Sequence, residues 1–213
     1  MFTGIIEEIG HLQSIKRNSR SAILTISADK VLEGTGIGDS IAVNGVCLTV
    51  AGMNGNSFDA DVMHETLDRS SLSLLRPDSK VNLERAMAAN GRFGGHIVAG
   101  HVDGTGRITN VKKDDNAVWY TIKADENIMR YIIEKGSVAI DGISLTVADT
   151  GRDYFKVSVI PHTRQLTILS DKRAGDIVNI ENDCVGKYIE KFMNSSDRDR
   201  GHLTKEFLLS NGF

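Results

Sequence analysis

The residues best suited to chemistry in this sequence are Ser40, Cys47 and His101. Ser40 and Cys47 flank an Asn44-Gly45 pair, so a tight turn would place them on neighbouring strands and on one face. His101 follows a glycine-rich stretch that would let the backbone come close to a bound molecule. A thiol, a hydroxyl and an imidazole supply a nucleophile and a base. The alternative is that Cys47 is a small buried apolar residue and His101 a surface loop residue.

Metal sites and phosphate loops have little support in the sequence. His96 and His101 lie five residues apart, but no Cys-x-x-Cys or His-x-x-x-His spacing accompanies them. The glycine-rich run at 34–38 precedes a strand pattern, so it lacks the helix N-terminus that binds phosphate. We therefore predict neither a zinc site nor a phosphate-binding loop.

One stretch of the chain occurs twice. Ser40–Val50 matches Ser137–Val147 at a constant offset of 97 over eleven positions. The pair that differs most in chemistry is Cys47 against Ser144. The copies are therefore predicted to share a shape but not a nucleophilic group. The same offset relates two later stretches, Val81–Glu84 and Val178–Glu181.

The repeat divides the chain into two modules and a C-terminal extension. We expect an N-terminal module at 1–97, a second module at 98–184 and the extension at 185–213. Phe2-Thr3-Gly4 resembles Val102-Asp103-Gly104, so the second copy is expected to begin at an offset of 100 that later falls to 97. The glycine-rich connection either brings the backbone close to a ligand or only bends the linker.

Short runs of β-forming residues separated by turn residues fill both modules. Phe2–Gly10 is expected to be a strand with a bend at Gly4, and Phe58–Met63 alternates as a half-buried strand does. Asn44-Gly45 and Asp141-Gly142 predict type I′ hairpins. Strands about ten residues apart with few helical stretches predict an all-β fold, either an antiparallel barrel or a sandwich.

The periodicity becomes helical after Glu181. Apolar residues at helical spacing predict one amphipathic helix: Val185, Tyr188, Ile189, Phe192 and Met193. Its apolar face packs either on the barrels of the same chain or on the same helix of other subunits. A charged linker leads to a last short helical segment, Leu203–Leu209, with Thr204 as its N-cap, and we expect this tail to be mobile.

Composition and charge exclude several classes of protein. The 213 residues carry a net charge of −3, without a long block of Lys or Arg, which argues against nucleic acid and anionic membranes as partners. No apolar run approaches the ~20 residues of a membrane span, and the N-terminus lacks the basic start of a signal peptide. We therefore expect a cytoplasmic protein in which Cys47 and Cys184 form no disulfide.

Four stretches together resemble the riboflavin synthase family of the α-chain type, which is built from lumazine-binding repeats. They are Met1–Ile6, Asn44–Val50, Gly94–Gly104 and Asp141–Val147. The resemblance covers about residues 1 to 193, and the glycine-histidine stretch is specific to this family. The tail beyond Asn194 lies outside the resemblance.

This resemblance implies a fold and a reaction. The fold is two tandem pseudo-symmetric six-stranded antiparallel Greek-key barrels, followed by a C-terminal helix that helps to assemble a homotrimer. The reaction is the dismutation of two 6,7-dimethyl-8-ribityllumazine molecules, in which one gives a four-carbon unit to the other. The products are riboflavin and 5-amino-6-ribitylaminopyrimidinedione, in the last step of riboflavin biosynthesis. Neither a cofactor nor a metal takes part, and the sequence leaves open whether a lumazine synthase is a further partner.

The resemblance also implies site residues, position by position. The implied catalytic residues are Phe2, Ser40, Cys47, His101 and Thr146. The first ligand cradle comprises Gly4, Ile5, Ile6, Cys47, Leu48, Thr49, Asp61, Val62, Met63, His64, Glu65 and Thr66. The second comprises Gly100, His101, Val102, Lys135, Ser144, Leu145, Thr146, Ile160, Pro161, His162, Thr163, Arg164 and Gln165. Each site is expected between the N-terminal barrel of one subunit and the C-terminal barrel of a neighbour.

Two other functions compete with this interpretation. The barrels are similar to those of non-catalytic lumazine- or flavin-binding antenna proteins of luminous bacteria, in which the Cys and His positions tend to be replaced. Cys47 and His101 are present here, which favours the enzyme. A flavin-binding reductase would need a nicotinamide-binding α/β domain, for which this chain has no room.

Overall fold

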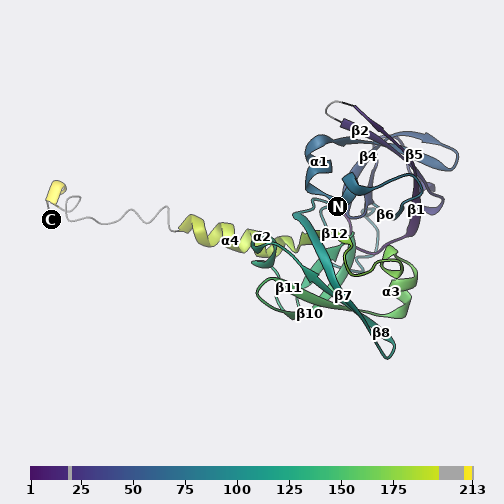
Figure 1. Cartoon of the computed structure of the whole chain (residues 1–213). Helices are drawn as coiled ribbons and strands as arrows, with labels where there is room; N and C mark the ends of the chain where they lie inside the picture. Colours follow the sequence, from purple (N-terminus) through teal and green to yellow (C-terminus); the bar gives the residue numbers. More distant parts are fainter. Residues whose placement is uncertain (19–20, 197–208, 213) are drawn as a thin grey trace. The chain divides into compact units, whose positions relative to one another are not determined.

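The computed structural model describes residues 1–18, 21–196 and 209–212 of the chain (Figure 1). The chain divides into two compact units, Met1–Asp183 and Cys184–Phe213. The first unit contains two closed barrels of antiparallel strands. Within the described residues, no helix is both long and apolar enough to cross a membrane.

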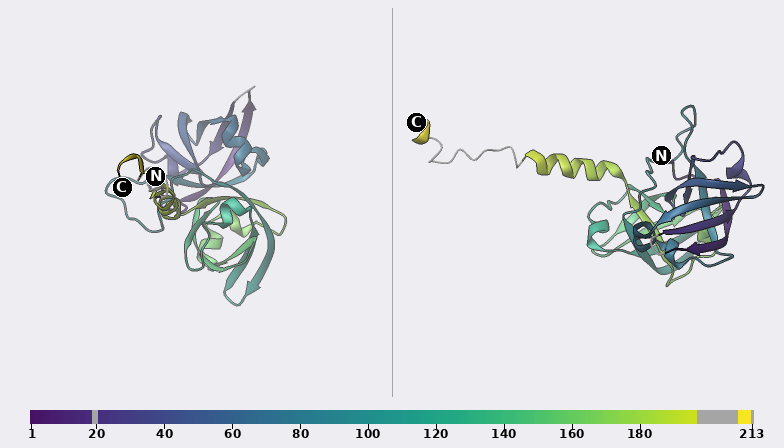
Figure 2. Two further views of the ribbon diagram at one scale, coloured as in Figure 1. Left: turned by 90° about the vertical axis from the view of Figure 1, so that its left-hand side faces the viewer. Right: turned by 90° about the horizontal axis from the view of Figure 1, so that it is seen from above.

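The first barrel closes in the strand order β1-β2-β5-β4-β3-β6. Its strands are β1 (Glu8–Arg17), β2 (Ser21–Ser27), β3 (Ser40–Val43), β4 (Val46–Asn54), β5 (Ser57–Met63) and β6 (Lys80–Arg85). Three short helical segments connect them: η1 (Lys30–Leu32), α1 (His64–Arg69) and η2 (Ser71–Leu74). Figure 2 shows each barrel as its own group of curved strands.

The second barrel has the order β10-β11-β8-β7-β12-β9. Its strands are β7 (Gly104–Asp114), β8 (Ala117–Lys123), β9 (Ser137–Ile140), β10 (Ile143–Thr150), β11 (Tyr154–Val159) and β12 (Ile177–Asn182). Its short helical segments are α2 (Glu126–Met129), α3 (Pro161–Gln165) and η3 (Ile168–Ser170). Because β7–β12 replace β1–β6 one for one in the closed ring, the two barrels share one topology. The predicted pair of six-stranded barrels is confirmed.

Alternating side chains explain which face of each strand is buried. In β4, Val46, Leu48 and Val50 are buried in the core of the first barrel, while Cys47 is half-buried and Thr49 is exposed. Successive residues of a strand point to opposite faces, so the second pair lies outside the barrel core. Apolar residues at the matching positions of β10 build the second core in the same way.

The register of β3 and β4 decides whether Ser40 and Cys47 share a face. Ser40 lies opposite Thr49 and Cys47 lies opposite Ala42. Because Ser40 and Ala42 are two residues apart, all four side chains point to the same side of the sheet. The predicted common face of Ser40 and Cys47 is confirmed.

The two predicted hairpin turns are confirmed and meet each other. Asn44-Gly45 has φ values of 47° and 78°, and Asp141-Gly142 has 44° and 82°, as type I′ turns require. The side-chain amide of Asn82 donates to the Asp141 carbonyl at 2.9 Å, and that of Asn179 donates to the Asn44 carbonyl at 2.8 Å. These reciprocal bonds join the barrels about a pseudo-twofold axis.

The start of the second copy differs from the prediction. The Gly4 amide donates to Glu84 and the Gly100 amide donates to Glu181, so Gly4 matches Gly100 at an offset of 96. The predicted offset of 100 is therefore wrong. It rested on the likeness of Phe2-Thr3-Gly4 to Val102-Asp103-Gly104, whereas the hydrogen bonds pair Gly4 with Gly100. The strand β1 also begins at Glu8, later than predicted, while the bend at Gly4 has a φ of +78°.

The second unit contains α4 (Cys184–Ser196), which confirms the predicted amphipathic helix. Within this chain its apolar side chains are all more than half exposed: Val185, Tyr188, Ile189, Phe192 and Met193. The rings of Tyr188 and Phe192 stack with centroids 6.5 Å apart. What covers this face stays a prediction. Of the predicted segment Leu203–Leu209, residues 203–208, with the N-cap Thr204, lie outside the described part of the chain, and Leu209 is helical.

Candidate active site

The first residues of each copy lie against the repeated strand of the other copy. The Ser144 amide donates to the Gly4 carbonyl at 2.8 Å, and the Cys47 amide donates to the Gly100 carbonyl at 2.9 Å. The structure therefore places two segments in the opposite cradle from the one predicted for each. Gly4–Ile6 belongs beside Ser144, and Gly100–Val102 belongs beside Cys47, because the two copies cross at a backbone bridge between Phe2 and Val98.

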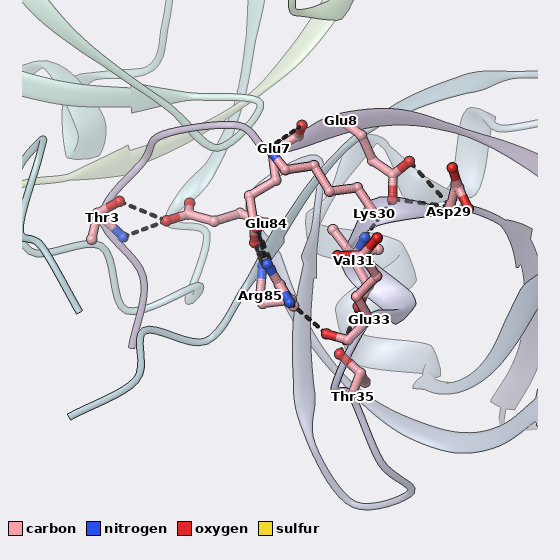
Figure 3. A network of polar contacts seen from close by, with 10 residues as sticks. All are labelled: Thr3, Glu7, Glu8, Asp29, Lys30, Val31, Glu33, Thr35, Glu84 and Arg85. Carbon is pink, nitrogen blue, oxygen red and sulfur yellow. Dashed lines mark hydrogen bonds and ion pairs between the residues drawn. The ribbon is translucent and has the colours of Figure 1, made fainter. Parts of the chain in front are cut away.

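Two buried glutamates hold these crossing segments. Glu84 accepts a hydrogen bond from the Thr3 amide at 2.7 Å (Figure 3) and another from the Gly4 amide at 3.0 Å. Glu181 accepts one from the Gly100 amide at 2.9 Å. Burial raises the pKa of the Glu84 carboxyl, and the hydrogen bonds from Thr3 and Gly4 oppose that rise. The carboxylates therefore position the backbone beside both candidate sites.

Only glycine fits at the two crossing points. A Cβ on Gly100 would lie 2.5 Å from the Cys47 Cβ and 2.8 Å from the Phe2 ring, and its φ is +82°. A Cβ on Gly4 would lie 2.6 Å from the Ser144 Cβ. The backbone at Gly100 therefore approaches Cys47 and Phe2 closely, as only glycine allows, while an approach to a ligand stays a prediction.

A cavity of about 240 Å³ opens beside Cys47. The strand β5 ends at Met63 and α1 begins at His64, so the start of the helix forms one wall. The exposed His101 arrives from the start of the second copy and forms another wall. The structure therefore brings the thiol and the imidazole to one cavity. Its lining residues are Val46, Cys47, Met63, Glu65, Thr66, Arg69, Ser70, Gly100, His101 and Val102.

Ser40 lines a different cavity. This cavity has a volume of about 690 Å³ and is lined also by Ile5, Glu7 and Arg85. Arg85 Nε lies 3.1 Å from both carboxylate oxygens of Glu7, a contact drawn in Figure 3. Burial favours the neutral acid, but the Arg85 guanidinium outweighs it and lowers the pKa of Glu7. The predicted group of three side chains is thus divided: Cys47 shares a cavity with His101, and Ser40 faces another.

The matching place in the second barrel holds different groups. Ser144 replaces Cys47, and its Oγ lies 2.7 Å from Nδ1 of the buried His96. Thr146 is exposed on the same strand, β10. Ile5 takes the place of His101 at the offset of 96. The second site therefore pairs a hydroxyl with an imidazole from a different position in the chain.

Lys135 has a backbone conformation that side chains rarely adopt. Its φ is +65°, and the matching residue of the first copy is Gly38 with a φ of +95°. A residue with a Cβ in this region costs about 1–3 kcal/mol and commonly occurs at functional positions. The binding role of Lys135 stays a prediction.

The predicted residues around α3 are distributed over its surface. Pro161, Arg164 and Gln165 line a cavity of about 280 Å³ together with residues of the β7–β8 hairpin. The Arg164 guanidinium donates to the Ser170 carbonyl at 3.0 Å, which fixes its position. Ile160 and His162 are exposed, whereas Thr163 is half-buried.

Several predicted site residues line none of the cavities described above. Phe2 has no exposed surface and packs with Ala42, Val98 and Ala139, with Cys47 against them. Its ring carries no proton to exchange, so it would act by holding Cys47. Leu48 and Val62 point into the first core. The remaining predicted residues divide into exposed ones, Thr49, Asp61 and His64, and ones packed against the second core, Ile6 and Leu145.

Four residues at the Cys47 cavity and beside Ser144 were not predicted from the sequence. Val46, Arg69 and Ser70 line the Cys47 cavity, and His96 contacts Ser144. The spacing of Glu65 and Arg69, which pair at 3.3 Å, could have placed Arg69 on the same helix face. Nothing in the sequence pattern indicated His96, because the contact joins residues 48 positions apart.

Comparisons with known proteins agree with this geometry. A family model described as the lumazine binding domain matches twice, at residues 3–86 and 99–183. Over the whole of both chains, the sequence is 57% identical to a riboflavin synthase of Actinobacillus pleuropneumoniae and 50% identical to one of Bacillus subtilis. The chain belongs to the riboflavin synthase family. Its two barrels are therefore the two lumazine-binding domains of that family.

Solved structures share the fold at lower identity. LumP complexed with 6,7-dimethyl-8-(1'-D-ribityl) lumazine superimposes with a TM-score of 0.78, and LumP complexed with riboflavin with 0.80. Both are 23% identical to the chain and cover 85% of it, while the match spans 99% of their own length. At this identity the likeness shows the fold alone, whereas the riboflavin synthase family rests on the full-length relatives.

Proposed function

We propose that this member of the riboflavin synthase family converts two 6,7-dimethyl-8-ribityllumazine molecules into riboflavin and 5-amino-6-ribitylaminopyrimidinedione. The observation that carries the proposal is the single cavity that Cys47 shares with His101, in a chain of this family. Antenna-type binding requires only a shaped pocket. A thiol and an imidazole at the same cavity additionally supply groups for addition and proton transfer.

The proposed chemistry uses the acidity of the substrate. The C7 methyl group of one lumazine loses a proton because the resulting carbanion delocalises into the ring, and His101 is the proposed base. Cys47, or a water molecule that it holds, adds at C7 of the second lumazine, which becomes the donor of the four-carbon unit. A positioned base contributes about 10²- to 10⁴-fold, and holding two rings in reacting geometry contributes further.

Ser40, Thr146 and Phe2 have supporting roles in the proposed reaction. Ser40 and Thr146 carry hydroxyl groups on the outer faces of β3 and β10, where they can hydrogen-bond a ribityl chain or a water molecule. Phe2 is buried behind Cys47 and the Gly100 backbone, so it would hold the thiol in place. These residues, together with those of the two cradles, form the proposed substrate-binding set.

The proposed assembly is a homotrimer with sites shared between subunits. The cavity beside Cys47, at about 240 Å³, is smaller than the ~300–1,000 Å³ of typical ligand pockets, which supports completion by a neighbour. Two rings of one substrate need two similarly shaped surfaces, and each chain has one in each barrel. The exposed apolar face of α4 supports a role in association, because burying each such side chain stabilises by roughly 1.5–3 kcal/mol before entropy.

The proposal includes a cytoplasmic location and a link to lumazine synthase. Cys47 and Cys184 are free thiols, as a reducing compartment allows. A lumazine synthase makes the substrate of the proposed reaction, so a physical association of the two enzymes would shorten the path between their sites.

The test is to incubate the purified protein with 6,7-dimethyl-8-ribityllumazine alone. We expect riboflavin to form without added cofactor, with one pyrimidinedione released per riboflavin. Absence of riboflavin despite tight binding of the lumazine would support the second candidate, a non-catalytic lumazine-binding protein. That candidate is favoured only by the shared fold with LumP.

The role of α4 is tested by removing residues 185–213. If its apolar face joins subunits, the truncated protein should sediment as monomers or dimers that bind ligand and turn over slowly. A variant with Lys187 and Lys191 replaced by Gln is the matched control, because it changes charge on the helix and keeps its apolar residues. An unchanged trimer after truncation would instead favour packing of α4 on its own chain.

A further inference from the structure

The imidazole of His96 lies buried against a hydroxyl of the second barrel. His96 is 8% exposed, and its Nδ1 lies 2.7 Å from Ser144 Oγ, within hydrogen-bond distance. The His96 amide donates to the Thr3 carbonyl at 3.2 Å, which ties this segment to the start of the chain. Ser144 itself is half-buried and lies on the outer face of the barrel, opposite Ala139.

Ser144 holds the position that Cys47 holds in the first barrel. Cys47 lies opposite Ala42 and Ser144 lies opposite Ala139, and both are on the outer face of their hairpins. In the first barrel the imidazole beside this position is His101. The residue that matches His101 is Ile5, which cannot exchange a proton. A second imidazole is therefore present at the second site through a contact that the repeat does not encode.

The surroundings of His96 indicate a neutral ring with one nitrogen not used by the fold. Burial lowers the pKa of His96, although the Asp183 carboxylate opposes the shift, so the ring is neutral at neutral pH. Its Nε2 is buried without a hydrogen-bond partner among the residues that the structure describes. Buried nitrogens without partners are uncommon, and each requires a reason beyond packing.

We propose that His96 is a positioning residue that holds the Ser144 hydroxyl in the orientation required by the lumazine bound at the second barrel. The inference rests on the proposed function. Either neutral tautomer of His96 can make this hydrogen bond, because Nδ1 either accepts the hydroxyl proton of Ser144 or donates its own proton to Ser144 Oγ. In both cases the Ser144 side chain is confined to one rotamer, and its remaining hydrogen-bonding capacity faces the ligand.

Two substitutions of His96 separate positioning from packing. The amide of Asn reaches about as far as Nδ1 of His, whereas the amide of Gln extends toward the place of Nε2. We expect His96→Gln to lower kcat about 10- to 100-fold, the scale of a misplaced reacting group, while the KM for lumazine changes less than about threefold. His96→Asn keeps a partner for Ser144, so its kcat should stay within about threefold of the parent.

A double-mutant cycle shows whether His96 acts through Ser144. Ser144→Ala should lower kcat by a factor similar to that of His96→Gln, and the double variant should be no slower than Ser144→Ala alone. Multiplying effects, or an unchanged kcat in His96→Gln, would overturn the inference. Histidine ¹⁵N NMR of the parent and Ser144→Ala covers the case that His96→Gln does not fold. A shifted His96 Nδ1 resonance supports the contact, and an unshifted one refutes it.

The same measurements separate this inference from the proposed function. A parent protein that forms no riboflavin would contradict the function, whatever the variants do. A parent that forms riboflavin, with His96→Gln as fast as the parent, would contradict only the role of His96.

Discussion

The two barrels have the same topology but differ at the residues that face their sites. The first barrel presents Cys47 and is joined by His101, whereas the second presents Ser144, held by His96. The residues that hold the crossing segments are instead matched in kind, as with Glu84 and Glu181. The two copies thus share the contacts that set the shape of each barrel, while the residues that face the two sites differ. Two similarly shaped surfaces can therefore treat two copies of one substrate differently.

A second difference lies at the hairpin turns on the pseudo-twofold axis. The first turn has the neutral Asn44, whereas the second has Asp141, which is fully buried. Asp141 Oδ2 lies 3.2 Å from Lys172 Nζ, an ion-pair distance without hydrogen-bond geometry. The residue that matches Lys172 in the first copy is Leu75. The second barrel therefore contains a buried charge pair where the first barrel has neutral residues.

The largest effect is expected where the barrels cross. Gly100→Ala introduces a Cβ 2.5 Å from that of Cys47 at a φ of +82°. Backbone strain of about 1–3 kcal/mol adds to overpacking of about 1–3 kcal/mol, so we expect a loss of roughly 2–6 kcal/mol of stability. Chemical denaturation measures it. Gly34→Ala is the control, because its φ is +74° with nothing within 4 Å, so it should lose only the strain. Equal losses would contradict the crossing contact.

The next effect concerns the buried charge pair. Lys172→Leu leaves the Asp141 carboxylate without its cation and should cost about 3–5 kcal/mol of stability at neutral pH. The double variant Asp141→Asn with Lys172→Leu gives the second barrel the residues of the first. It should be neutral or up to about 4 kcal/mol more stable than the parent. A double variant as unstable as the single one would show that the pair is needed for reasons other than its charge.

The pH dependence of this pair has a definite sign. Burial raises the pKa of Asp141 above its usual 3.8, and Lys172 only partly opposes this, so the folded protein binds the proton more tightly than the unfolded chain. The contribution of Asp141 to the free energy of unfolding of the parent should therefore fall as the pH rises from about 3.8 through the raised pKa. The double variant lacks this dependence. Unfolding curves across acidic and neutral pH should therefore diverge as the pH rises.

A smaller effect is expected from making the first site resemble the second. Cys47→Ser keeps a small polar group but loses the polarizable thiol, so we expect riboflavin formation to slow about 10- to 100-fold. Lumazine binding should be retained, the pattern of an interaction made mainly in the transition state. Steady-state kinetics and a binding titration measure the two effects. His101→Gln should slow riboflavin formation in the same way. If both variants formed riboflavin at the rate of the parent, Cys47 and His101 would only line the cavity and would have no catalytic role.

The smallest expected effect is a difference in affinity between the barrels. Because the two sites have one shape and unlike side chains, each chain should bind two molecules of a lumazine analogue. Their affinities should differ by about tenfold, or roughly 1.4 kcal/mol. Calorimetry with an unreactive analogue gives the stoichiometry. One site per chain, or two sites of equal affinity, would contradict the comparison of Cys47 with Ser144.

The sequence alone determined the repeat, the hairpins and the all-β fold. These follow from local rules, since Asn44-Gly45 and Asp141-Gly142 require one turn type and alternating residues bury one strand face. The same rules placed Ser40 and Cys47 on one face, and the helical periodicity predicted α4. The sequence motifs also indicated the riboflavin synthase family, to which the full-length relatives assign the chain.

Only the tertiary structure decided which residues meet at the sites. The crossing at Phe2 and Val98 exchanges Gly4–Ile6 and Gly100–Val102 between the barrels, and no local pattern encodes that exchange. The contact of His96 with Ser144 arises in the same way. Side-chain periodicity reports the faces of one element, whereas a site depends on contacts between elements distant in the chain, which form when those elements pack.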